Sequence, residues 1–256
     1  MTILKKFLLL SIVCCLLLSC ASKEKPEYLL TDSNLRIFAG GDHNHYAVLD
    51  ANATTDTLKS YSLTYSNENL AAPDSSTLNT LTEDYSNSDI NPLPFISRIL
   101  TQSNAGDLIL HGFKNADEIY WIVEDDIAQT GLTLYPKNIA EFSDSISITR
   151  TLKTCSNKTC ESKGQLNISL QKLGAEIVET PYAYFEAYKF NVIFEITIQG
   201  ENPVSRSVSG VHWLHPAIGV VKFSYDVYDA SNSATLIGTL TDTNISIPSR
   251  YKKPGS

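Results

Sequence analysis

The chain has 256 residues, of which 43% are apolar, and its 20 basic and 28 acidic side chains give a net charge of −8. This length and apolar fraction suit one large β domain or two small ones. The acidic balance argues against nucleic-acid binding, which needs a basic face to neutralise phosphates, and against electrostatic adsorption to anionic lipid.

The N-terminus has the layout of a secretory signal. Lys5 and Lys6 precede an uncharged apolar run at residues 7–18. A membrane-spanning helix needs roughly 20 apolar residues, so this run is too short to be a permanent anchor. It ends in Leu17-Leu18-Ser19-Cys20, which resembles the lipobox of bacterial lipoproteins. An ordinary signal peptide with an incidental cysteine is the alternative.

The lipobox resemblance implies that residues 1–19 are a signal peptide and that Cys20 becomes a lipidated, palmitate-bearing N-terminus. Several acyl chains together hold a protein stably on a membrane. Ala21 follows the cysteine, where an aspartate would be the usual inner-membrane retention signal. We therefore expect a lipid-anchored protein of the bacterial outer membrane that faces the periplasm. Cleavage removes two lysines and no acid, so the mature net charge is about −10.

The rest of the chain is expected to be one β-rich domain over residues 36–250. Residues 20–35 are polar and lack helical or strand periodicity, which predicts a tether between lipid and domain. The segment at residues 66–91 is dense in Ser, Thr, Asn and Asp, and we interpret it as a long surface loop. This loop allows a subregion boundary near residues 66–106. Residues 251–256 form a C-terminal tail.

Period-two alternation predicts several strands, and no stretch predicts a long amphipathic helix. The clearest of the shorter predicted strands are Leu108–Phe113, Ile119–Val123, Leu132–Leu134, Val220–Tyr228 and Ala234–Thr241. The fold class is therefore mostly all-β, with a curved antiparallel sheet or open half-barrel and few short helices. A closed barrel and a sandwich are the alternatives.

Cys155 and Cys160 are the cysteines that remain for pairing once Cys20 is lipidated. Alternating segments on both sides predict two strands joined across the turn between them. Hairpin partners lie close enough for a disulfide, which would stabilise the fold by roughly 2 kcal/mol on the chain-entropy model. A redox site would need Cys-x-x-Cys and a zinc site two further ligands, and neither is evident.

Aromatic side chains alternate along the longest predicted strand, at residues 182–198. Tyr182, Tyr184 and Tyr188 share one face with the apolar residues that follow them. Such a face packs on a core, while the opposite face meets water. An aromatic face can also line a cleft for lipid or glycan, so these three tyrosines and Trp213 are the candidate ligand contacts.

The C-terminal third of the chain carries a second resemblance. The segments Glu179–Lys189 and Trp213–Lys222 look like a pattern that recurs in uncharacterised bacterial lipoproteins and periplasmic proteins. Their sheets are similar to the curved antiparallel sheet of the periplasmic lipoprotein carriers. The chain departs from the pattern at Tyr184, where glycine or threonine is usual, and at Ala217, where glycine is usual. The resemblance implies the fold, and a carrier-like role as one functional alternative.

Candidate catalytic and metal-binding residues are few. The chain contains no Gly-x-Ser-x-Gly, His-Glu-x-x-His or phosphate-loop motif. His43 and His45 fall on the same side of an extended segment, and His212 and His215 could converge at a turn. A metal site needs a third ligand, which the sequence does not identify. We therefore predict no catalytic residue, no metal and no cofactor.

Together these features predict a noncatalytic envelope lipoprotein that serves as a binding or structural module. Its partners would be the membrane, through the N-terminal lipid, and an envelope protein, a glycan or a lipid, but no nucleic acid. A lipid or lipoprotein carrier is the first alternative. An enzyme that acts on cell-envelope polymers is the second, suggested by location alone.

Overall fold

The structure is a computed structural model that describes most of the chain from Glu27 onward. The described residues are 27–36, 38–52, 58–86, 90, 95–115, 118–123, 131–200 and 203–252. The predicted signal peptide and Cys20 lie outside them. Within the described residues, no helix has the length and apolar character needed to cross a membrane.

Thirteen strands and two short 3-10 helices make up the regular structure of the described residues. The strands are β1 (His43–Asp50), β2 (Lys59–Ala71), β3 (Thr77–Ser86), β4 (Ser97–Gln102), β5 (Leu108–Asn115), β6 (Glu118–Ile122), β7 (Leu132–Tyr135), β8 (Ser145–Ser156), β9 (Thr159–Glu179), β10 (Tyr184–Ile198), β11 (Val204–His215), β12 (Gly219–Asp229) and β13 (Asn232–Thr243), and the helices are η1 (Ile139–Glu141) and η2 (Ser249–Tyr251). The predicted all-β class is therefore confirmed.

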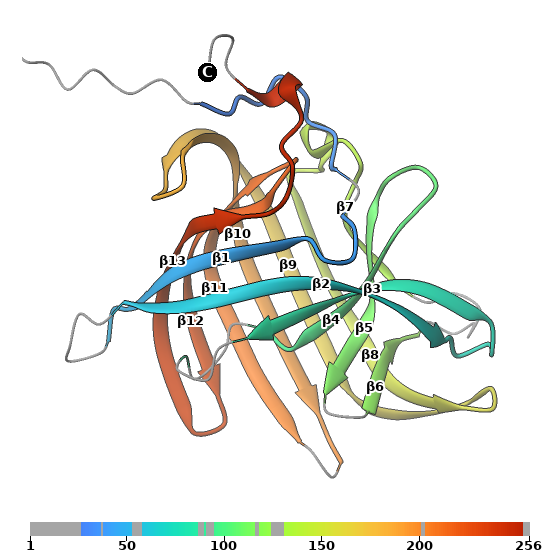
Figure 1. Cartoon of the computed structure of the whole chain (residues 1–256). Coiled ribbons are helices and arrows are strands. Elements are labelled where there is room, and N and C mark those ends of the chain that lie inside the picture. The colour runs from blue at the N-terminus through green and yellow to red at the C-terminus, as the bar shows by residue number, and fades with distance from the viewer. Residues whose placement is uncertain are drawn as a thin grey trace, which may run out of the picture.

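The strands form one antiparallel sheet that closes on itself (Figure 1). Neighbours follow the order β4-β3-β2-β1-β13-β12-β11-β10-β9-β8-β6-β5, and β5 pairs back onto β4, with β7 added beside β5. The expected open half-barrel is therefore wrong, and the closed barrel that was the alternative is found. Closure pairs the strand edges that an open sheet would leave exposed.

Alternating side chains fill the barrel and form its core. On β10, the residues from Phe190 to Ile198 alternate between buried aromatic or aliphatic side chains and more exposed ones, which are polar except for Ile193. The buried set packs against aromatic side chains from other strands, such as Phe113 of β5, whose ring lies 5.7 Å from that of Phe194. The prediction that this apolar face packs on the core is therefore confirmed for the residues from Phe190 onward.

The polar segment at residues 66–91 was expected to be a loop, and this expectation is wrong. It contains the second half of β2 and all of β3. Among the described strands, residues 68–71 and 77–80 pair only with each other, because β1 pairs with β2 up to Thr64 and β4 pairs with β3 at residues 81–83. A two-stranded ribbon buries neither face fully, so it shows little of the apolar alternation that marks a strand.

The segment at residues 27–36, expected to be part of a tether, is bound to the end of the barrel. The backbone N–H of Glu27 and that of Tyr28 donate to the Tyr184 carbonyl at 2.9 and 3.2 Å, and Glu186 N–H donates to Tyr28 O at 2.8 Å. Leu29 N–H donates to the carbonyl of Tyr251 in η2 at 2.6 Å. The tether prediction therefore does not hold for residues 27–35. Strand β10 extends past the end of β11, so the backbone groups of β10 that β11 does not pair can bind this segment.

Candidate functional site

The inside of the barrel contains a small cavity of about 70 Å³. Aromatic and aliphatic side chains line it, and Leu35 and Phe38 of the N-terminal segment are among them. Pockets that hold small molecules measure roughly 300–1,000 Å³, so this cavity is several-fold too small for a lipid or a sugar. The barrel interior is a packed core with a polar centre.

An ion pair between Glu83 of β3 and Arg98 of β4 forms part of that polar centre. The Arg98 guanidinium donates to the Glu83 carboxylate, and the two side chains are 20% and 3% exposed. The Tyr85 hydroxyl donates to the same carboxylate at 2.7 Å, and the Phe95 ring lies 4.9 Å from the guanidinium carbon. The positive charge of Arg98 and the negative charge of Glu83 cancel, so the pair offers no net charge to a ligand.

His212 of β11 occupies the other part of the polar centre. Its Nδ1 lies 2.9 Å from the Tyr225 hydroxyl and its Nε2 lies 3.0 Å from the Tyr135 hydroxyl. Burial, together with a smaller effect of the positive charge of Arg98, lowers the pKa of His212 to about 3. The imidazole is therefore neutral at physiological pH and serves as a hydrogen-bonded core residue.

His215 does not join His212. Its ring packs 5.5 Å from Phe185 and 5.2 Å from Tyr251, under the segment that closes the barrel end. Burial lowers the pKa of His215 to about 3, so it too is uncharged at neutral pH. The predicted convergence of His212 and His215 into one site is therefore wrong, since successive side chains of a strand point to opposite faces and these two are three residues apart.

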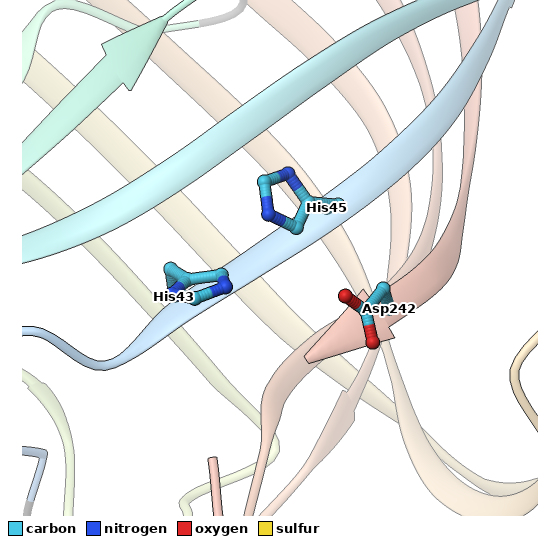
Figure 2. A group of neighbouring side chains, drawn as sticks. All are labelled: His43, His45 and Asp242. Carbon is cyan, nitrogen blue, oxygen red and sulfur yellow. The ribbon is translucent and has the colours of Figure 1, made fainter. Parts of the chain in front are cut away.

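His43 and His45 of β1 lie on the same side of their strand, as the sequence predicts. A third possible metal ligand from another strand lies beside them. The ring centroids are 4.8 Å apart, and Asp242 of β13 completes a group whose potential metal-ligand atoms all lie within 4.8 Å of one another (Figure 2). Both imidazoles are half-buried and the carboxylate is exposed. Sequence reasoning missed Asp242 because it lies at the opposite end of the chain.

The three predicted tyrosine contacts hold the N-terminal segment and the strands together. The Tyr182 ring is stacked near Tyr28, with centroids 6.4 Å apart. The Tyr188 hydroxyl lies 2.6 Å from the Ser33 hydroxyl, and Tyr184 accepts the backbone hydrogen bonds of the N-terminal segment. These contacts account for the tyrosines without a ligand.

Trp213 lies apart from the tyrosines, on a patch formed by Trp213, Glu176, Lys189 and Lys222, which we call the Trp213 patch. The indole N–H donates to Glu176 Oε1 at 2.6 Å, and the Nζ atoms of Lys189 and Lys222 lie 5.0 and 5.6 Å from the ring centroid. The Trp213 side chain thus presents an aromatic face between two cations. The four predicted contact residues therefore do not form one surface.

Cys155 and Cys160 form a disulfide across the β8–β9 turn, the pairing expected from the sequence. They are register partners, with Cα atoms 4.1 Å apart. The turn residues Asn157 and Lys158 both have positive φ, at 50° and 65°. Positive φ at both central residues is typical of the tight turn that suits the twist of a two-stranded hairpin.

Comparison with known proteins returned two similar solved structures. One is a protein assigned as exported, with a YmcC-like fold, from Bacteroides fragilis, and the other is a protein assigned as a lipoprotein from Parabacteroides distasonis. Each is 12% identical to this chain, with 83% of this chain and 100% of the other covered, and the TM-scores are 0.38 and 0.30. No family model and no curated protein matches the chain. TM-scores below 0.5 are too low to assign a fold or a function to this chain.

Proposed function

We propose that this protein is a lipid-anchored lipoprotein of the bacterial outer membrane, facing the periplasm, that acts as a noncatalytic binding or structural module. The supporting observation is the docked N-terminal segment. Its first described residue, Glu27, follows the lipobox cysteine Cys20 by only six intervening residues. Six extended residues span at most roughly 20 Å, so the lipid would hold one end of the barrel next to the bilayer.

The filled barrel interior favours a partner that binds the outer surface. The Trp213 patch is the candidate for that contact, because tryptophan is enriched at the centres of protein interfaces, whereas charged residues such as Lys189, Lys222 and Glu176 suit a polar rim. The partner would be an envelope protein or a glycan. The carrier alternative requires the core to open, since the cavity of about 70 Å³ cannot take an acyl chain.

The anchor is tested with Cys20→Ala in the full-length chain, expressed in a bacterium. We expect radiolabelled palmitate in the wild type and none in the variant, together with loss of the protein from the outer-membrane fraction. Equal labelling and equal membrane retention would contradict the anchor.

The binding role is tested with a photoreactive residue placed at Asn191, next to Lys189 on the same face of β10. We expect one defined adduct in living cells, which Trp213→Ala weakens. A photoreactive residue at the exposed Asp226 of β12 serves as the matched control and should give no such adduct. Identical adducts at both positions, or none at Asn191, would argue against the patch.

A further inference from the structure

We infer that His43, His45 and Asp242 form a binding site for a divalent transition-metal ion, with Zn²⁺ as the expected occupant. The two imidazoles and the carboxylate have their possible ligand atoms within 4.8 Å of one another, on the outside of the barrel wall (Figure 2). On one tetrahedral zinc ion, ligand atoms lie roughly 3.3 Å apart, given bond lengths of about 2.0–2.1 Å. Small side-chain rotations of the exposed Asp242 and the half-buried imidazoles would close that difference.

A β-bulge in β13 brings the carboxylate to the histidines. His45 pairs with Asp242 and Tyr46 pairs with Leu240, so Thr241 is an extra residue on β13. Leu236 and Leu240 are buried, and strict alternation would turn Asp242 into the barrel as well. The bulge instead turns Asp242 outward, where it is exposed opposite His45. Bulges commonly re-aim a side chain at a functional site.

Neighbouring residues fix the positions of both histidines. The Nδ1 atom of His45 lies 2.6 Å from the hydroxyl oxygen of Ser62, its register partner on β2. A metal-binding imidazole usually hydrogen-bonds through its other nitrogen in this way, which leaves Nε2 for the ion. The backbone N–H of His43 donates to Asn244 Oδ1 at 2.6 Å, and the Thr241 hydroxyl donates to the His45 carbonyl at 3.1 Å.

The ligand types select the class of ion. Imidazole nitrogen suits Zn²⁺, Cu²⁺ and Ni²⁺, whereas Ca²⁺ and Mg²⁺ prefer sites made of oxygen alone. Three protein ligands from two neighbouring strands leave a fourth position for water. Since Asp242 is exposed and the imidazoles are half-buried, that position would face solvent. Zinc sites with three protein ligands and one open position are the kind that bind or activate a further molecule.

The experiment uses the mature lipoprotein in detergent, without a histidine tag and freed of metal by a chelator. Zn²⁺ is titrated in competition with a chromogenic chelator, and Co²⁺ is then used for its visible spectrum. We expect one Zn²⁺ per chain and a tetrahedral Co²⁺ spectrum that Zn²⁺ displaces and excess Mg²⁺ or Ca²⁺ does not. His43→Gln, His45→Gln and Asp242→Asn should each weaken Zn²⁺ binding at least tenfold.

Asp226→Asn provides the matched control, because Asp226 is an exposed carboxylate on the adjacent strand β12 and lies outside the group. Its Zn²⁺ affinity should equal that of the wild type. Circular dichroism checks that every variant retains the sheet. Absence of stoichiometric binding, or binding that survives His43→Gln combined with His45→Gln, would overturn the inference.

Discussion

The ion pair between Glu83 and Arg98 inside the barrel is expected to contribute strongly to the stability of the fold. Arg98→Met leaves the Glu83 carboxylate, 3% exposed, with the hydroxyls of Tyr85 and Tyr65 as neutral hydrogen-bond partners and no cation. Removing one partner of a buried ion pair destabilises a protein strongly, and we expect a loss of roughly 3 kcal/mol in the free energy of unfolding. Urea denaturation measures this loss.

The control for this prediction is Lys114→Met, which breaks the more exposed ion pair between Lys114 of β5 and Glu68 of β2, whose side chains are 35% and 26% exposed. Exposed pairs contribute below about 1 kcal/mol. Similar losses of unfolding free energy in Arg98→Met and Lys114→Met would show that the buried pair stabilises the fold no more than the exposed pair.

His212 predicts a specific acid sensitivity. Burial lowers its folded-state pKa to about 3, whereas an unfolded histidine titrates near 6.5. Between these values only the unfolded chain binds the proton, so stability falls as the pH decreases from about 6.5 toward 3. From pH 7 to pH 5 we expect this residue alone to cost about 2 kcal/mol.

His212→Gln tests the acid sensitivity, because glutamine can still hydrogen-bond to the two tyrosine hydroxyls and does not titrate. Urea denaturation at pH 7 and at pH 5 should give a smaller difference in unfolding free energy for the variant than for the wild type. His215 contributes in the same direction in both proteins, since its pKa is also lowered to about 3. Equal differences would contradict the assignment to His212.

The residue scale also shows what the sequence could and could not predict about the candidate site. The shared side of His43 and His45 follows from period-two geometry, because one residue separates them. Asp242 was beyond prediction, since it reaches His45 through the pairing of β1 with β13 and through a bulge that reverses its direction. Neither the pairing nor the bulge leaves a pattern in the local sequence.

At the scale of elements, the β8–β9 hairpin offers a test of the disulfide. Replacing both Cys155 and Cys160 with Ala removes a crosslink around a short loop, and the chain-entropy model predicts a loss of about 2 kcal/mol. The paired backbone of β8 and β9 extends well beyond the turn, so the barrel should remain folded. Thermal unfolding followed by circular dichroism measures the loss. An unfolded double variant would mean that the disulfide is needed for the fold itself.

Strand β11 contains a glycine that the barrel wall requires. Gly210 has φ +142°, and a Cβ atom added there would lie 2.1 Å from the Ser224 carbonyl oxygen of β12. Gly210→Ala must therefore shift backbone, and we expect a loss of more than about 1 kcal/mol in unfolding free energy. Gly174→Ala is the matched control, because Gly174 has a similar φ of +124° and nothing within 4 Å of the added atom. Equal losses would assign the effect to φ alone.

The sequence predicts those strands that have one face packed on the barrel core and the other face in water. The alternation along β10 and β12 predicted both strands because their inner residues touch the core along most of their length. The β2–β3 ribbon packs only Leu70 and Leu78 against a small cluster of Ile99, Trp121 and Val123, so its polar sequence resembles that of a loop. Closure of the barrel depends on the β4–β5 pairing, which joins short strands with a register shift between Ile99 and Leu100. Local periodicity carries no information about that pairing.

At the scale of the whole molecule, the docked N-terminal segment predicts how the barrel of the proposed lipoprotein would lie on a membrane. The N-terminal segment and η2 lie at one end of the barrel, and the β12–β13 turn lies at the other (Figure 1). Strands of this length rise about 3.3 Å per residue, so the far end is tens of ångströms from the near one. The η2 end should therefore lie close to the bilayer.

Fluorescent labels at Arg250→Cys and Ser231→Cys test this orientation in the lipidated protein on vesicles with a headgroup quencher. Cys155 and Cys160 are joined to each other and do not take up the label. We expect strong quenching at position 250 and weak quenching at position 231. The reverse order, or equal quenching, would contradict the orientation.

The pairing of β1 with β13 also determines when the protein can finish folding. Strand β1 cannot complete its pairing until β13 has been synthesised, because Tyr46 of β1 pairs with Leu240 of β13. At a synthesis rate of about 5–20 residues per second, the interval between these two strands is roughly ten to forty seconds. Contacts between such distant parts of a chain also form slowly. Until then the unpaired β1 edge and Tyr46 are exposed to other chains, so the arrival of the C-terminal strand is the step that ends the risk of misassembly.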